Sequence, residues 1–292
     1  MSGGQRAVVV EAAGFLSLIQ DRGRFGLLAA GVGVSGAADV ASHDLANRLV
    51  ANDPDAATIE NTMGGLRLRF LGATLLATTG APAQLSVDGR DIGHDSVTAV
   101  EPGQVVSLAL PAAGLRTYLA IRGGLDVAPV MGSRSTDTLS GLGPGPLAAG
   151  DLLRLGPEPT GFPVLDQAPV APVADGTVLL HASLGPREGW FANPEALFET
   201  TWTASVNSNR IGVRLEPGSG SEQLERRVEG ELPVEGMMTG AIQVPPAGHP
   251  VAFLADHPVT GGYPVIATID WADIPRLAQV RPGQAVRFVR SR

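Results

Sequence analysis

The chain has 292 residues, enough for two domains or for one large β domain. Hydrophobic residues make up 44% and charged residues 17%, so the chain can bury a core and is not intrinsically disordered. A net charge of −8, no basic stripe and only 4% aromatic residues argue against nucleic acid as a partner.

Two amino acids are missing, and each absence excludes chemistry. Without cysteine there is no disulfide, no thiolate nucleophile and no cysteine-ligated metal. All 21 basic residues are arginine, and the lack of lysine excludes a Schiff-base enzyme, a P-loop NTPase, a Ser–Lys hydrolase and a site for attached biotin. The five histidines have no metal-ligand spacing, so no metal site is expected.

Glycine (38) and proline (23) are spread along the chain and favour many turns between short strands. In the N-terminal half, helical spacing predicts a helix over residues 38–51, with Asp39 as its cap and Pro54 beyond its end. Apolar runs predict strands at 8–11, 16–20, 65–70, 74–79, 84–87, 105–110, 118–122 and 151–155.

A proline-rich stretch divides the chain. We expect an N-terminal β module over residues 1–160, a linker over 161–176 and a C-terminal β module over 177–292. Strands are predicted there at 177–182, 202–206, 213–216, 241–244, 251–255, 265–269 and 285–289, and short helices at 194–200 and 272–277. Trp190, Trp202 and Trp271 are expected in the core. The fold class is mainly β with a few short helices.

One short internal repeat suggests two related modules. The segment Pro-Gly-Gln-Val-Val at residues 102–106 returns as Pro-Gly-Gln-Ala-Val at 282–286. Proline followed by glycine specifies a type II turn, here feeding a strand in each half. Because such turns are common in β proteins, a chance match remains the alternative.

The stretch richest in chemistry is residues 256–264, directly after an apolar strand. Asp256 and His257 can exchange protons, and the hydroxyl of Thr260 precedes a glycine pair that lets backbone amides approach a ligand. Tyr263 completes the set. The structural alternative is a tight turn with a capping aspartate.

Three further polar stretches are candidates. Arg210 follows the turn residue Asn209, and an arginine there can hold a carboxylate or form a structural ion pair. Ser35 and Asp39 flank a glycine-rich turn at a helix start, which either binds an anion or caps the helix. A third group, residues 122–125 with Gly132–Thr136, carries Arg122, Arg134, Ser135 and Thr136 and has the composition of an anion nest or an ordinary turn.

Taken in order, these stretches resemble one family. The matching segments are residues 19–24, 33–39, 45–50, 122–125 with 132–136, 209–215, 236–245 and 256–264. They resemble the biotin-dependent carboxyltransferase-like family of the 5-oxoprolinase C-type subunit, also labelled KipA or allophanate hydrolase subunit 2, which is related to part of urea carboxylase.

The resemblance implies two cyclophilin-like β-barrel modules. The sequence itself has no run of about 18 apolar residues and no signal-peptide region, which predicts a cytoplasmic protein. It implies a hydrolase subunit of an ATP-dependent 5-oxoprolinase, which opens the lactam 5-oxoproline to L-glutamate with B-type (KipI-like) and A-type subunits. ATP is then a co-substrate of the complex, and this chain binds no cofactor through a recognisable motif.

Two alternatives stay open. One is a non-enzymatic KipA-type protein that antagonises a kinase inhibitor. The other is a carboxyltransferase or urea-amide component, which requires biotin on a separate carrier because this chain has no lysine.

At the family-matching positions, residue chemistry suggests roles. Asp256 is expected as general base or orienting carboxylate, with His257 beside it. The Thr260 hydroxyl and the backbone of Gly261 and Gly262 are expected to bind a developing oxyanion. Arg210 is expected to anchor the substrate carboxylate, and the remaining substrate-binding candidates are Asn209, Tyr263, Ser35, Asp39, Arg134, Ser135 and Thr136.

Overall fold

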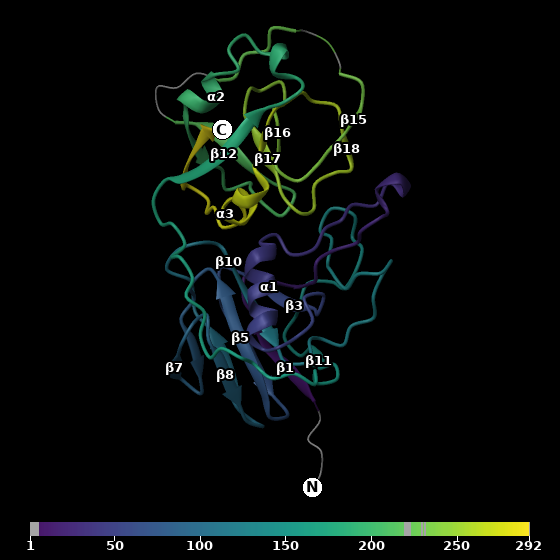
Figure 1. Ribbon diagram of the computed structural model, residues 1–292, viewed down its shortest axis with the longest axis vertical. Helices are drawn as coiled ribbons and strands as arrows, with labels where there is room; N and C mark the ends of the chain where they lie inside the picture. The colour runs from purple at the N-terminus through teal and green to yellow at the C-terminus, as the bar shows by residue number, and fades with distance from the viewer. Residues whose placement is uncertain (1–5, 219–222, 229, 231, 292) are drawn as a thin grey trace. The chain divides into compact units, whose positions relative to one another are not determined.

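The computed structural model describes residues 6–218, 223–228, 230 and 232–291, and these divide into two compact units (Figure 1). Unit 1 comprises residues 1–24, 39–137 and 141–173; unit 2 comprises residues 25–38, 138–140 and 174–292. Two short stretches of the N-terminal half therefore belong to the C-terminal unit, a feature that the continuous module expected over residues 1–160 did not include.

Unit 1 contains two antiparallel sheets. The six-stranded sheet has the order β11(Leu152–Arg154), β1(Ala7–Ala13), β4(Leu66–Phe70), β9(Val105–Leu108), β6(Leu85–Val87), β7(Arg90–Ile92). The five-stranded sheet has the order β2(Leu16–Gln20), β3(Thr58–Thr62), β10(Arg116–Ile121), β5(Thr74–Gly80), β8(Val97–Val100). Both sheets are open, so the closed barrel expected for this half is present only as a two-sheet arrangement.

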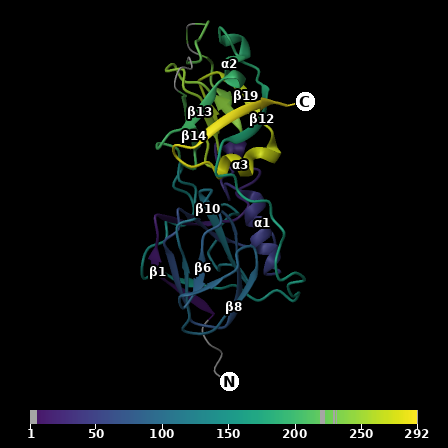
Figure 2. The same cartoon turned by 90° about the vertical axis from the view of Figure 1, so that its left-hand side faces the viewer.

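The two sheets of unit 1 share one apolar core. Strand β4 shows the underlying pattern, because Leu66, Leu68 and Phe70 are buried while Arg67 and Arg69 between them are exposed. The helix α1(Val40–Leu49) lies against β5 and β10 (Figure 2). Its cap is the predicted one: the side chain of Asp39 accepts a hydrogen bond from the backbone N–H of Ser42.

Unit 2 is built on a closed seven-stranded barrel. Its strand order is β12(Val178–Leu184), β19(Val265–Ile269), β16(Ala241–Gln243), β17(Val251–Phe253), β14(Gly212–Pro217), β13(Thr201–Ala204), β20(Ala285–Arg290). Among the strand pairs of the described residues, β12–β20 is the parallel one. Outside the barrel, β15(Glu235–Gly236) pairs with β18(Thr260–Gly261), and the helices are α2(Ala196–Glu199) and α3(Ile274–Ala278). Short 3-10 turns lie at Leu28–Ala30, Glu188–Trp190 and Trp271–Asp273.

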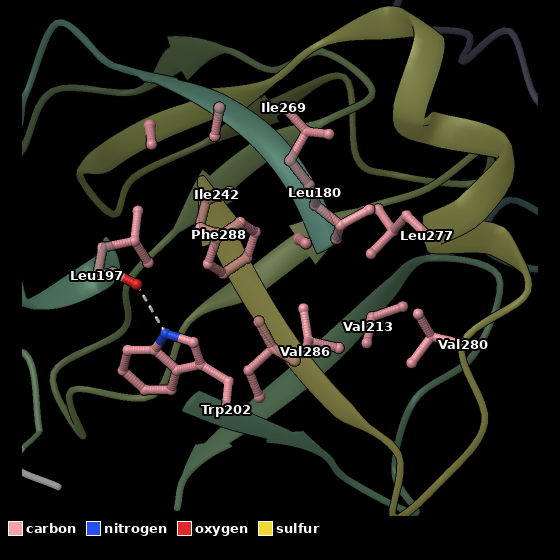
Figure 3. Close-up of a cluster of buried hydrophobic side chains, with 14 of the residues drawn as sticks. Leu180, Leu197, Trp202, Val213, Ile242, Ile269, Leu277, Val280, Val286 and Phe288 are labelled. Atoms are coloured by element: carbon pink, nitrogen blue, oxygen red, sulfur yellow. Dashed lines mark hydrogen bonds between the residues drawn. The ribbon is translucent and has the colours of Figure 1, made fainter. Parts of the chain in front are cut away.

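The barrel interior packs around Trp202 (Figure 3). The indole Nε1 donates a 3.0 Å hydrogen bond to the carbonyl of Leu197, which satisfies the only polar atom of the side chain in an apolar setting. Trp190 is half-buried against the same cluster. Trp271 is 69% exposed, so its expected place in the core was wrong; it begins a surface 3-10 turn.

The mainly β architecture with few short helices is confirmed. The repeated Pro-Gly turns are also confirmed: Gly103 and Gly283 have φ of 89° and 82°. The backbone N–H of Gln104 donates a hydrogen bond to the backbone carbonyl of Glu101, and the backbone N–H of Gln284 donates to the carbonyl of Arg281. In both turns the side-chain oxygen of the glutamine accepts a hydrogen bond from the backbone N–H of the first turn residue. Within the described residues, no helix has the length and apolar character to cross a membrane.

Candidate functional site

The carboxylate of Asp256 is the centre of a buried polar cluster in unit 2. Its Oδ1 accepts hydrogen bonds from the Ser35 hydroxyl at 2.7 Å and from Nη2 of Arg210 at 2.9 Å. Its Oδ2 accepts from Nε of Arg210 at 2.9 Å, and from the backbone N–H and hydroxyl of Thr138 at 2.9 and 2.7 Å. The carboxylate therefore joins three segments that are far apart in the sequence.

Local folding explains why these groups meet. Asp256 follows β17, and its backbone N–H bonds the carbonyl of Arg210, which precedes β14; β14 and β17 are neighbours in the barrel. Nη2 of Arg210 also donates to the carbonyl of Gly36 at 2.5 Å. Ser35 has φ of 54° and Gly36 has φ of 89°, a left-handed turn that the glycine adopts without strain and that presents this carbonyl.

The ion pair at the centre of the cluster is closed to solvent, whereas Thr138 at its edge is exposed. The Asp256 side chain is 0% exposed and that of Arg210 is 2% exposed. Burial alone raises the pKa of Asp256, but the charge of Arg210 and the hydrogen bonds from Arg210, Thr138 and Ser35 outweigh it, so the pKa lies below its ordinary value. Asp256 is thus held as an anion.

This geometry does not favour Asp256 as a general base or Arg210 as an anchor for a substrate carboxylate, whereas the alternative expectation of Asp256 as an orienting carboxylate is compatible with it. A carboxylate offers about four acceptor positions, and here it accepts five hydrogen bonds, so it has no capacity left for a water or substrate proton. Bidentate pairing commits the guanidinium of Arg210 to Asp256 and not to a ligand. The alternative considered for Arg210 from the sequence was a structural ion pair at the surface. The structure shows such an ion pair with Asp256, but the pair is buried.

The later part of the loop is more accessible. His257 is buried, stacks on the Phe253 ring at 5.9 Å between centroids, and places Nδ1 2.8 Å from the carbonyl of Pro258. Beyond it, Thr260 is exposed in the short strand β18, and Tyr263 is 44% exposed. The Tyr263 ring lies 5.6 Å from the Arg226 guanidinium.

Gly261 packs closely against neighbouring side chains. A Cβ built on Gly261 would lie 2.7 Å from Nε2 of Gln243 and 3.2 Å from the Met237 side chain. The same Gln243 amide donates a 3.0 Å hydrogen bond to the carbonyl of Tyr263. Gln243 therefore supports the loop from β16. Gly261 is half-buried and pairs with Glu235 of β15, whereas Gly262 is exposed.

The third candidate group lies in unit 1 and forms a satisfied polar network. The carboxylate of Asp21 accepts from the Ser133 hydroxyl and from the backbone N–H of Arg134, both at 2.6 Å. Ser135 is buried and bonds the Arg24 guanidinium through its hydroxyl and its carbonyl. Thr136 is buried with its hydroxyl 2.9 Å from the carbonyl of Pro144. The hydroxyls of this group thus hold the loop rather than face a ligand.

The remaining candidates have local structural roles. Asp39 caps α1, and the Asn209 side chain accepts the backbone N–H of Ile211 at 2.8 Å, closing the turn before β14. Thr138 was missed, because nothing in its sequence neighbourhood distinguishes it. No group of three or more metal-ligating side chains occurs among residues that the structure describes.

Comparison with known proteins places these features in context. The family model described as "Carboxyltransferase domain, subdomain A and B" matches residues 30–290. A curated relative, the C-type subunit of the Escherichia coli 5-oxoprolinase, is 36% identical over 285 residues, which cover 95% of this chain and 89% of the relative.

Two solved structures are similar over nearly the whole chain. TTHA0988 has a TM-score of 0.85 at 33% identity, covering 98% of this chain and 55% of that one. The urea amidolyase of K. lactis has a TM-score of 0.91 at 27% identity, covering 100% of this chain and 19% of that one. The chain therefore spans about half of the first structure and about a fifth of the second.

Proposed function

The chain belongs to the family of carboxyltransferase domain subdomains A and B, and on that premise we propose that it is the C-type subunit of a 5-oxoprolinase. The proposed reaction opens the lactam of 5-oxoproline to L-glutamate and hydrolyses ATP. We further propose that B-type and A-type subunits complete the enzyme, and that ATP is a co-substrate of the complex.

One observation carries this choice. The match to the E. coli 5-oxoprolinase protein covers 95% of this chain and 89% of that protein, so the two correspond almost end to end. The match to K. lactis urea amidolyase, although structurally close, covers only 19% of that protein. The extensive correspondence with a 5-oxoprolinase subunit is the reason for preferring this function over that of a carboxylase.

For the loop after β17 we propose a division of labour. The Asp256–Arg210 pair is a positioning element: it fixes the root of the loop and ties down Ser35 and Thr138. Ligand contact then falls to the accessible part, the Thr260 hydroxyl, the backbone of Gly261 and Gly262, and Tyr263. Backbone amides and a hydroxyl fixed in place can stabilise the oxyanion that develops when a lactam carbonyl is attacked.

A second candidate function is carboxyl transfer, favoured by the TM-score of 0.91 to urea amidolyase. This reaction requires carboxylated biotin on another chain, because a chain without lysine cannot carry biotin itself. The two proposals differ in substrate: a lactam with ATP in one, a carboxybiotin donor with a urea-like amide acceptor in the other.

A substrate comparison separates them. The purified chain, combined with A-type and B-type subunits, is expected to release L-glutamate from 5-oxoproline in an ATP-dependent manner and to leave urea unchanged. Carboxylation of urea by this chain with a biotin carrier, and no glutamate from 5-oxoproline, would replace the first proposal by the second.

Loop variants test the division of labour. Thr260→Val should lower kcat/KM for 5-oxoproline about tenfold without changing thermal stability, because it removes only the exposed hydroxyl. The matched control is Thr201→Val, a change of the same chemistry at an exposed position of β13, which should leave kcat/KM within about twofold. Equal effects of the two changes would remove Thr260 from the site.

A further inference from the structure

Unit 1 holds a cavity of about 260 Å³ that the features discussed so far do not use. Four segments line it: residues 53–57, 123–126, Arg134, and 156–157. The glycine pair at 123–124 and Arg134, noted in the sequence as parts of one candidate nest, thus meet at the same cavity. Its volume is slightly below the ~300 Å³ at which ligand pockets usually begin, so a ligand must be small.

Arg134 is the one basic residue in the lining of this cavity among the residues that the structure describes. Arg134 is half-buried and donates from Nε to the carbonyl of Val127 at 2.9 Å, which fixes the side chain. Its Nη1 and Nη2 have no hydrogen-bond or ion-pair partner among residues the structure describes. Arg122 cannot serve as a second cation, because its guanidinium is bound by the carbonyls of Val50, Pro159 and Gly161.

The same cavity carries three carboxylates, Asp53, Asp55 and Asp126. Asp126 has no ion pair in the described part of the chain, and neither has Asp53, which accepts the backbone N–H of Asp55. Oδ1 of Asp55 lies 4.0 Å from Nε of Arg22, and the same guanidinium forms two hydrogen bonds with Asp44. The lining therefore has one positive and three negative groups.

The backbone N–H groups of the glycine pair are not available to bind a simple anion. The backbone N–H of Gly123 bonds the Asn52 side chain, and that of Gly124 bonds the carbonyl of Ile121, so both amides are used. Two excess carboxylates also repel a free anion such as phosphate. A simple cation, in turn, leaves the guanidinium of Arg134 without a partner.

We propose that this cavity binds a free α-amino acid, and preferentially one with a cationic side chain. The α-carboxylate pairs with the two Nη atoms of Arg134, which suit bidentate recognition. The α-ammonium and the side-chain cation lie among Asp53, Asp55 and Asp126, so a ligand with charges of +2 and −1 complements a lining with charges of −3 and +1.

Two of the lining glycines pack closely against neighbouring segments of the lining. A Cβ on Gly124 would lie 3.1 Å from the Ala56 Cβ, and one on Gly156 would lie 2.5 Å from the carbonyl of Gly123. Both glycines pack directly against neighbouring backbone or alanine, and a larger residue would push the lining segments apart or into the ligand space. This inference does not depend on the proposed oxoprolinase activity.

The test is calorimetric titration of the purified full-length chain with L-lysine, L-alanine, acetate and methylammonium chloride. L-lysine is expected to bind with a Kd of about 1 mM, and L-alanine about fivefold more weakly. The one-charge probes acetate and methylammonium should each bind at least tenfold more weakly than L-lysine. Absence of saturable L-lysine binding up to about 50 mM, or equal binding of acetate, overturns the proposal.

Two variants locate the binding. Arg134→Gln keeps a side-chain donor and should weaken L-lysine binding at least tenfold; Asp126→Asn, at an exposed position, should weaken it about threefold. The matched controls are Arg90→Gln and Asp166→Asn, exposed in unit 1 outside the cavity lining, which should leave Kd unchanged. Unchanged binding in Asp126→Asn and in a folded Arg134→Gln variant places L-lysine elsewhere and refutes the assignment.

Discussion

The substitution Asp256→Asn tests the buried pair most sharply. It removes the charge that neutralises Arg210 but keeps the size of the side chain and one acceptor oxygen. Arg210 then keeps its positive charge without the Asp256 carboxylate, and its side chain is 2% exposed, away from water that could solvate it. The variant should therefore unfold more easily than the wild type, with the loss confined to unit 2.

The magnitude follows from the burial of both partners. Breaking a fully buried ion pair by removing one charge costs about 3–5 kcal/mol. This is a large part of the ~5–15 kcal/mol by which a domain is stable, so Asp256→Asn should bring unit 2 close to its stability limit. Arg210→Met should cost a similar amount, and the double variant should cost about 1–3 kcal/mol less than the sum of the single changes.

The assay is urea denaturation followed by tryptophan fluorescence. All three tryptophans, Trp190, Trp202 and Trp271, belong to unit 2, so the signal reports on that unit alone. Asp175→Asn, at an exposed position of the same unit, is the matched control and should change the free energy of unfolding by less than about 0.5 kcal/mol. A loss below about 1 kcal/mol in Asp256→Asn, or additive single changes, would refute the reasoning.

The pH dependence of stability gives a second, independent test of this prediction. The pKa of Asp256 lies below its ordinary value in the folded chain, whereas in the unfolded chain it is about 3.9. Its stabilising contribution is therefore complete above about pH 4 and is lost as the pH falls through the folded-state pKa. The difference in unfolding free energy between wild type and Asp256→Asn should shrink in that acidic range, and a constant difference would contradict the assignment.

Three further predictions concern the cores and α1. Trp202→Phe removes the donor to the carbonyl of Leu197 and leaves a partly filled space, so it should destabilise unit 2 by about 1–3 kcal/mol in the same fluorescence assay. Gly64→Ala should abolish stable folding of unit 1, because its Cβ would lie 2.2 Å from a backbone carbonyl at φ of +71°. Gly89→Ala, at φ of +78° in open space, should cost only about 1–2 kcal/mol by thermal melting. Burial lowers the pKa of His43, so its neutral form is kept when folded. The protection of α1 against hydrogen exchange should be complete above about pH 6.5 and fall as the pH drops toward the lowered pKa, and His43→Gln should remove this dependence.

The sequence predicted the strands whose apolar residues alternate or run together, and missed those that bury polar groups. Strand β3, with the sequence Thr-Ile-Glu-Asn-Thr, is buried throughout although it reads as a polar loop. Glu60 within it accepts a hydrogen bond from the Tyr118 hydroxyl at 2.7 Å, and the amide of Asn61 donates to Ser17 at 2.9 Å. Partners on distant strands satisfy these groups, and no local pattern reveals them.

The candidate site shows the same limit. The residue types at 35, 210 and 256 were recognised as polar groups worth attention, and the structure joins all three in one cluster. The sequence left the role of Asp256 open between a base and an orienting carboxylate, because whether an aspartate is a base or an anchored anion depends on its partners and not on its neighbours in the chain. Thr138, which supplies two of the five hydrogen bonds, lies 118 residues away from Asp256.

The most direct test of the proposed function measures glutamate release with and without this chain in the reaction mixture. A mixture of this chain with A-type and B-type subunits, 5-oxoproline and ATP is expected to form glutamate and ADP in equal amounts, and omission of this chain is expected to reduce glutamate formation to background. Full glutamate formation in its absence, or ATP consumption with no glutamate when all three chains are present, would contradict the proposal.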